Sequence, residues 1–173
     1  MSPAKETRLD DVEGIEAAID SISIRARAAL GALCLRRYAS ALGVHHRDIE
    51  EVVDYCFALG PAQDIVAWEQ NPPRLALGMG EPLPPDVVDA VGQEHTASLG
   101  RLWDEVLGIG YCDLYGATTD GSKRHLLAAL RILQAANVPV PDPTPFQVSS
   151  FSEWHGWGEV IPSEVAAHWR ELE

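Results

Sequence analysis

The chain has 173 residues, of which 46% are hydrophobic and 23% charged, a globular composition that argues against intrinsic disorder. Its 26 acidic and 13 basic side chains give a formal net charge of −13, which repels phosphates and predicts no nucleic-acid partner. We expect residues 1–173 to form one domain, because a chain of this length can bury a sizeable core without metal or disulfide support.

The first part of the chain predicts two helices, one around Asp10–Ile19 and a long one over residues 21–42. The second is rich in Ala and Leu, and its apolar residues cover most of its circumference, which is typical of a helix at the centre of a bundle. An unpaired buried charge is costly, so its arginines should reach solvent or meet carboxylates. These arginines are Arg25, Arg27, Arg36 and Arg37.

The segment HHRDIEEVVDYCFAL, residues 45–59, has the clearest amphipathic pattern. Apolar residues at i, i+3, i+4, i+7 and i+8 predict one buried stripe: Ile49, Val52, Val53, Cys56 and Phe57. The other face carries Glu50, Glu51 and Asp54, which are candidates for binding a partner. Glu50 and Asp54 lie four residues apart, where like charges repel, so this face is unsatisfied unless an arginine lies close.

The middle of the chain mixes short helices with loops. PAQDIVAWEQ, residues 61–70, predicts a short helix, and the prolines and glycines of residues 71–85 predict a loop. Helical periodicity resumes over residues 86–107, where Gly92 and Gly100 weaken the helix and predict a bend or a break.

The last third predicts a leucine-rich helix over residues 122–137, an extended proline-rich connector at 138–145, an aromatic loop and a terminal helix with Ser163 as a possible N-cap. The fold class is therefore all-α, a single-domain irregular bundle of five to seven helices. The expected core includes Leu33, Ile49, Val53, Phe57, Val91, Leu102, Leu130 and Leu133.

Three short motifs resemble segments of an uncharacterised bacterial family of small, acidic helical proteins. They are CLRRY at 34–38, the IEEVVDY helix that follows, and DLYG at 113–116. The resemblance covers about half of the chain, and the proline-rich stretch and the WHGWG tail depart from the family pattern. It implies an acidic helical fold and assigns no functional residue.

No catalytic or metal-binding motif accompanies these elements. His45 and His46 stand near Asp48 and two glutamates, but there is no HExxH and no clustered cysteine, so we expect no metal and no cofactor. A small enzyme or ligand-binding protein that uses this histidine pair with nearby carboxylates stays open as an alternative function.

The three cysteines are odd in number and far apart, which suggests neither a disulfide framework nor a metal site. Cys34 and Cys56 fall on apolar stripes, where a thiol is usually inert, whereas Cys112 lies in a loop. With no apolar signal core and no membrane span, the sequence predicts a cytoplasmic protein that does not enter a membrane.

The start of the leucine-rich helix carries positive charge where the helix dipole disfavours it. If Ser122 is the N-cap, Lys123, Arg124 and His125 occupy the first turn. One explanation is a site that binds a phosphate or carboxylate. The favoured alternative is an internal salt bridge to some of the many acidic residues.

Trp154 and Trp157 lie among glycines in a predicted loop, where they can close the bundle or anchor a partner. We expect Trp157 to be packed and Trp154 to be more exposed. The leading interpretation is a cytoplasmic protein-binding protein, immunity-like or regulatory, that engages a basic partner. An enzyme or ligand-binding protein using the histidine pair or the cluster at 123–125 is the alternative.

Overall fold

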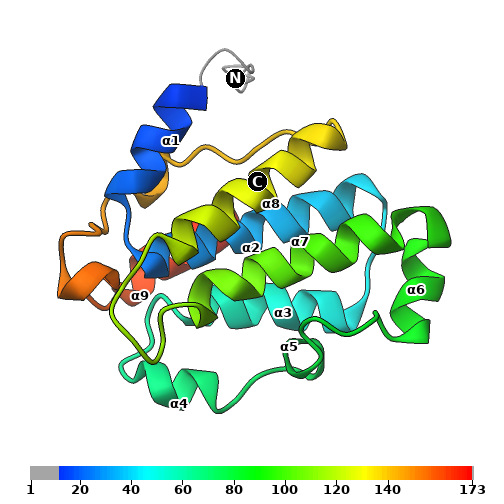
Figure 1. Ribbon diagram of the computed structural model, residues 1–173, viewed down its shortest axis with the longest axis horizontal. Helices are drawn as coiled ribbons and strands as arrows, with labels where there is room; N and C mark the ends of the chain where they lie inside the picture. Colours follow the sequence, from blue (N-terminus) through cyan, green and yellow to red (C-terminus); the bar gives the residue numbers. More distant parts are fainter. Residues whose placement is uncertain (1–11, 173) are drawn as a thin grey trace.

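A computed structural model describes residues 12–172 as an all-α fold of nine α-helices and two short 3-10 helices (Figure 1). The α-helices are α1 Val12–Ser21, α2 Ile24–Ala41, α3 Arg47–Ala58, α4 Ile65–Glu69, α5 Arg74–Leu77, α6 Pro85–Val91, α7 Gln93–Tyr111, α8 Gly121–Ala135 and α9 Ser163–Glu171. The 3-10 helices are η2 Thr144–Phe146 and η3 Trp154–Gly156. The predicted fold class is confirmed, with more helices than the five to seven expected. Asp10, the expected start of the first helix, and Glu173 lie outside the described residues.

The centre of the bundle is α2, which packs against α3, α7 and α8 (Figure 1). Fourteen of its 18 residues are buried, which confirms the central position that its apolar circumference predicts. The eight residues expected in the core are all buried. The phases of α3, α7 and α8 are therefore those that the apolar periodicity indicates.

The segment between α3 and α7 breaks into three helices of four to seven residues, which explains the larger helix count. Its prolines and glycines prevent a longer helix, although residues 74–77, expected in a loop, form one turn. Gly92 adopts a φ of +87° and separates α6 from α7, so the break expected between 86 and 107 lies there. The helix α7 then runs through Gly100 to Tyr111.

After α8, the chain crosses the bundle through the proline-rich connector to η2 and α9 (Figure 1). The Phe146 and Trp169 rings lie 4.9 Å apart between centroids, and Trp169 Nε1 donates to the Pro145 carbonyl at 3.1 Å. These contacts fasten the terminal helix. Pro162 occupies the N-cap position of α9, so Ser163 is not the cap that we expected.

The buried Arg25 of α2 binds backbone carbonyls in place of carboxylates. It is 4% exposed, and its Nη1 donates to the carbonyls of Leu59 at 2.5 Å, Gly60 at 2.9 Å and Ala62 at 2.8 Å. These carbonyls follow the last turn of α3, where the helix dipole places negative charge and backbone acceptors lack helical partners. The expectation of solvent or a carboxylate is wrong here.

Arg27 likewise binds backbone carbonyls, at the end of α1. It is 2% exposed, and it donates to the carbonyls of Ile19 and Asp20 and, at 2.8 Å, to Ser122 Oγ. Its guanidinium also lies over the Phe151 ring, 4.3 Å from the centroid. Burial lowers the pKa of Arg27 to about 10, so the side chain is charged at neutral pH.

The other two arginines of α2 also reach backbone oxygens. Arg36 donates to the carbonyls of Arg170 and Leu172 at the end of α9, and Arg37 donates to the Pro139 carbonyl at 3.2 Å. The central helix thus binds the C-terminal ends of α1, α3 and α9 through arginine side chains.

Candidate functional site

The acidic face of α3 is mostly neutralised by arginines. Arg47 Nε lies 2.7 Å from Glu51 Oε1, and Arg170 Nη1 lies 2.5 Å from Asp54 Oδ1. Glu50 is exposed and makes no ion pair with the described residues. The face expected to attract a basic partner therefore offers one unpaired carboxylate rather than three.

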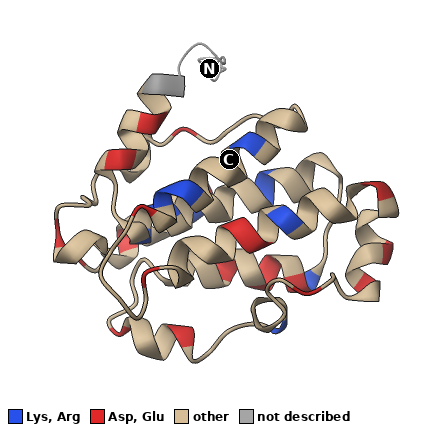
Figure 2. Ribbon diagram, in the orientation of Figure 1, with Lys and Arg blue, Asp and Glu red and all other residues tan. Residues whose placement is uncertain are grey.

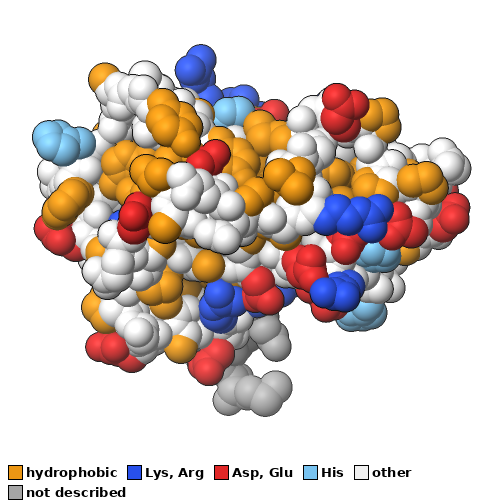
Figure 3. Space-filling model, turned by 90° about the horizontal axis from the view of Figure 1, so that it is seen from below, with side chains coloured by type: hydrophobic (Ala, Val, Ile, Leu, Met, Phe, Trp, Pro, Cys, Tyr) orange, Lys and Arg blue, Asp and Glu red, His pale blue; other side chains and the backbone are white. Residues whose placement is uncertain are grey.

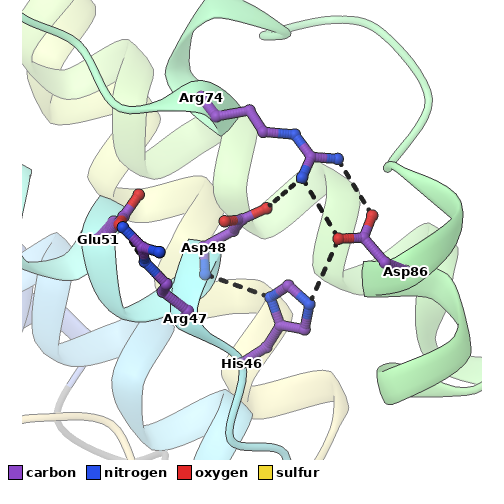
Figure 4. Close-up of polar contacts among 6 residues, drawn as sticks. All are labelled: His46, Arg47, Asp48, Glu51, Arg74 and Asp86. Carbon is purple, nitrogen blue, oxygen red and sulfur yellow. Dashed lines mark hydrogen bonds and ion pairs between the residues drawn. The ribbon is translucent and has the colours of Figure 1, made fainter.

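A polar network joins the start of α3 to α5 and α6 (Figure 4). His46 is the N-cap residue of α3, and its Nδ1 accepts a hydrogen bond from the Asp48 backbone N–H at 3.2 Å. Arg74 Nη1 lies 3.1 Å from Asp48 Oδ2, and its Nη2 lies 3.1 Å from Asp86 Oδ1. His46 Nε2 is 3.7 Å from Asp86 Oδ2.

This network acts as a structural clamp between three helices. The hydrogen bond from Arg74 holds the pKa of Asp86 below its ordinary value. His45, the neighbour of His46 in the sequence, is exposed. Within residues 12–172, no three His, Cys, Asp or Glu side chains are grouped so that they could hold a metal ion.

The cluster at the start of α8 is divided among different neighbours. Ser122 is buried against Arg27, while Lys123 Nζ forms ion pairs with Glu16 at 3.0 Å and Asp20 at 2.7 Å. The internal salt bridge, the favoured alternative, is therefore present. Asp120 rather than Ser122 occupies the N-cap position.

The rest of that cluster faces α7. His125 Nδ1 lies 2.8 Å from Glu105 Oε2, and Arg124 is exposed. Residues 122–125 thus do not converge on one anion, contrary to the single site that we considered.

The three thiols are poor nucleophiles. Cys34 and Cys56 are buried, as their positions on apolar stripes predict, and burial raises the pKa of each to about 12. Cys112 is an exposed residue, yet partial burial of its thiol and the adjacent Asp113 carboxylate raise its pKa to about 12 as well. None of these thiols is a thiolate near neutral pH.

The aromatic loop displays one tryptophan and packs the other. Trp154 is 68% exposed, whereas Trp157 is half-buried against the core, which confirms the expected order. Trp154 and His155 both have left-handed backbones, with φ values of 45° and 54°. Two consecutive non-glycine residues in this region are uncommon and strained.

A second loop supports this one at the same end of the bundle (Figure 1). Thr118 Oγ1 donates to the His155 carbonyl. Gly156 has a φ of +93°, and a Cβ there would lie 2.7 Å from Thr118 Cγ2 and 2.9 Å from the Phe151 ring. Only glycine fits this contact, which fixes the backbone beside Trp154.

The supporting loop exposes Tyr115, which no sequence pattern singled out. Its side chain is 78% exposed, and its hydroxyl donates to Glu69 Oε2 of α4 at 3.0 Å. The sequence placed it in a loop without any pattern that distinguishes a displayed ring from a packed one. We define the aromatic end as Trp154, Tyr115 and the loops 112–120 and 151–158 that carry them.

The charge around the aromatic end is negative. Its two loops contain Asp113, Asp120 and Glu153 and no Lys or Arg, and Glu159 follows directly. Figure 2 shows acidic positions on the loops at this end of the bundle. Asp120, Glu153 and Glu159 are exposed.

Exposed apolar residues continue onto the neighbouring face, which carries α4 and α5. Val66 is 45% exposed, Leu77 76% and Met79 40%. Figure 3 shows hydrophobic side chains spread over this side of the molecule. The aromatic end and this face together hold most of the large apolar side chains that the described chain leaves exposed.

A scan against family models and searches of curated proteins and of solved structures find no match to this chain. The resemblance to a family of small, acidic helical proteins therefore stays a hypothesis. In the described part of the chain, every helix is too short or too polar to cross a bilayer.

Proposed function

We propose that this is a cytoplasmic protein-binding protein, immunity-like or regulatory, whose aromatic end engages a basic partner. The observation that carries the proposal is the 68% exposure of Trp154 on a strained backbone beside the loop of Tyr115. The three unpaired cysteines fit a reducing compartment.

The energetics of the loop favour recognition over folding. A left-handed non-glycine residue costs about 1–2 kcal/mol, and the exposed part of the Trp154 ring contributes no burial in return. A partner that covers the ring would recover this cost, since tryptophan and tyrosine dominate interface hot spots at about 2 kcal/mol or more each. The contacts of Gly156 and His155 with the loop of Thr118 hold the backbone beside Trp154 before binding, which lowers the entropy lost on binding.

The negative charges at the aromatic end favour a partner with a positively charged surface. Asp120, Glu153 and Glu159 are exposed, and the two loops carry no Lys or Arg, while buried Arg27 and Arg25 interact electrostatically with Asp120 and Glu159. These exposed carboxylates favour contact with a basic surface. On α3, by contrast, Arg47 and Arg170 already neutralise two of the three carboxylates. The proposal therefore places the contact at the aromatic end rather than on the acidic face of α3.

The test is affinity capture from the cells that express the protein, with W154A, Y115A and L77A beside the wild type. Leu77 is a matched control, because it is 76% exposed but lies on α5. We expect a basic protein that wild type and L77A capture, that W154A and Y115A lose, and that salt elutes. The same captured proteins for wild type and W154A would contradict the proposal.

A further inference from the structure

A groove of about 600 Å³ lies between the C-terminal end of α2 and the facing sides of α7 and α8. On α7 it is bordered by His95, Ser98 and Arg101, which are spaced three residues apart and share a helix face. Its apolar wall includes Leu42, Ile132 and Val138. The short side chains of Ala128 and Ala135 on α8 leave the space between the helices unfilled.

The arginines of this groove differ from the other basic residues of the described chain. The others bind carbonyls or carboxylates, but Arg101, Arg124 and Arg131 make no hydrogen bond or ion pair within residues 12–172. All three lie on α7 and α8, where Figure 2 shows basic positions on facing ribbons. In a chain with twice as many acidic as basic side chains, three unpaired arginines on one side are unexpected.

Arg101 and Arg131 border the groove itself, from opposite helices. Arg124 borders a neighbouring hollow of about 430 Å³, which shares Glu105 and Ala128 with the groove. The Glu105 carboxylate at this junction is bound to His125 at 2.8 Å and forms no ion pair with Arg101. The groove thus combines two available guanidinium groups with an apolar wall.

We propose that this groove binds a small anionic amphiphile, with a carboxylate or phosphate head on Arg101 and Arg131 and an alkyl or aryl body along Ala128, Ile132 and Ala135. Guanidinium groups bind both heads through paired hydrogen bonds. The apolar body would be removed from water by the helix faces. This site is separate from the aromatic end, so it goes beyond the proposed protein contact.

The size of the groove favours a small molecule over a helical peptide. Pockets for small ligands measure about 300–1,000 Å³, a range that includes this one. A helix with its side chains is about 10–12 Å across, so a single turn of it would take up roughly 400–600 Å³ and fill this volume. Most of the lining residues lie on α2, α7 and α8, which pack on one another, and Leu42, Ala136 and Val138 directly follow these helices, so the groove is part of the bundle.

Calorimetric titration with decanoate and decyl phosphate tests the proposal. Decanol is the control without a charged head, and acetate is the control that has the carboxylate head but no alkyl body. We expect the wild type to bind at least one of the two anions at least about tenfold more tightly than decanol, and acetate weakly. The preferred head distinguishes a carboxylate from a phosphate ligand. Wild type that binds neither anion, or binds decanol equally well, would overturn the proposal.

Variants locate the bound anion. We expect R101Q/R131Q to weaken binding at least about tenfold, and A135W, at an exposed position on the groove edge, to weaken it by obstructing the apolar body. R47Q is the matched control, since Arg47 is 87% exposed and lies on α3. If R101Q/R131Q does not fold, R101Q and R131Q alone give the same test. Unchanged affinity in folded arginine variants would show that the anion binds elsewhere.

Discussion

Buried Arg25 and Arg27 bind backbone carbonyls at the C-terminal ends of α3 and α1. Each guanidinium is a multiple donor, and a helix C-terminus presents several carbonyls that lack helical partners. The Nη1 of Arg25 alone binds three such carbonyls after α3. These carbonyls, together with the electrostatic effect of Glu159, offset much of the cost of burying the Arg25 charge.

Replacing Arg25 with methionine should lower the free energy of unfolding by about 2–4 kcal/mol, because the carbonyls after α3 would stay buried and lose their donor. Urea denaturation measures the change. R47M is the control and should stay within about 0.5 kcal/mol, since Arg47 forms an exposed ion pair. A loss below about 0.5 kcal/mol for R25M would show that the carbonyls find water instead.

At the scale of elements, glycines on α7 decide how closely its neighbours pack. Gly108 lies under the His125 ring, and a Cβ there would lie 2.6 Å from His125 Cε1. Gly100, eight residues earlier on the same helix, is open: its nearest neighbour would be Leu83 at 3.9 Å. Both glycines weaken the same helix, but there is room for a Cβ only at Gly100.

G100A should therefore raise the free energy of unfolding by about 0.5–1 kcal/mol, because alanine favours the helix over glycine. G108A should lower it by about 1–3 kcal/mol, because the added methyl displaces His125 from Glu105 and from α7. Thermal and urea unfolding of the pair give the comparison. Equal gains for both variants would mean that His125 moves aside freely.

The clamp of His46, Arg74 and Asp86 gives a pH-dependent contribution. The pKa of Asp86 is lowered by Arg74, so this stability is present above the unfolded carboxyl pKa and is lost as pH falls through the folded value. D86N should be less stable than wild type near pH 7, and the gap should close as pH falls below the ordinary carboxyl pKa of about 4 and Asp86 is protonated. D89N is the control on α6, because Asp89 makes no ion pair with the described residues. A gap that persists at low pH would assign the effect to something other than the carboxylate.

At the scale of the whole molecule, local patterns could predict the bundle. The apolar stripe from Ile49 to Phe57 and the leucines of α8 are set by the helical period, so their burial follows from spacing. The break at Gly92 follows from a residue that accepts a positive φ. Prolines and glycines between α3 and α7 indicated irregularity but not the bounds of α4 and α5, which depend on tertiary contacts.

Candidate sites were harder to predict, because pairing is a tertiary property. Arg25 binds carbonyls that follow α3 and Arg27 binds carbonyls at the end of α1, and nothing in the local sequence marks a C-terminal carbonyl as a partner. The prediction that Trp157 is more buried than Trp154 followed from its closer position in the sequence to α9. No neighbouring element gave a comparable indication for Tyr115. Arg131 has no acidic residue three or four positions away, the one local sign that it is unpaired.

The two tryptophans of the aromatic loop should separate folding from recognition. W154A should keep its free energy of unfolding within about 1 kcal/mol of wild type, because the ring is exposed and alanine bears the same left-handed strain as tryptophan. W157A should lose more, since Trp157 packs against the core. Urea denaturation of W154A, W157A and the wild type measures these free energies of unfolding. A loss of about 3–5 kcal/mol for W154A would make the ring part of the core instead.

The affinity of W154A for the basic partner captured by the wild type tests the central claim most directly. Titration calorimetry with that purified partner should show binding weakened at least about thirtyfold, which corresponds to about 2 kcal/mol for a tryptophan hot spot. L77A, at a residue that is 76% exposed but lies on α5, should bind as wild type does. Equal affinity of W154A and wild type would contradict a partner contact at the aromatic end.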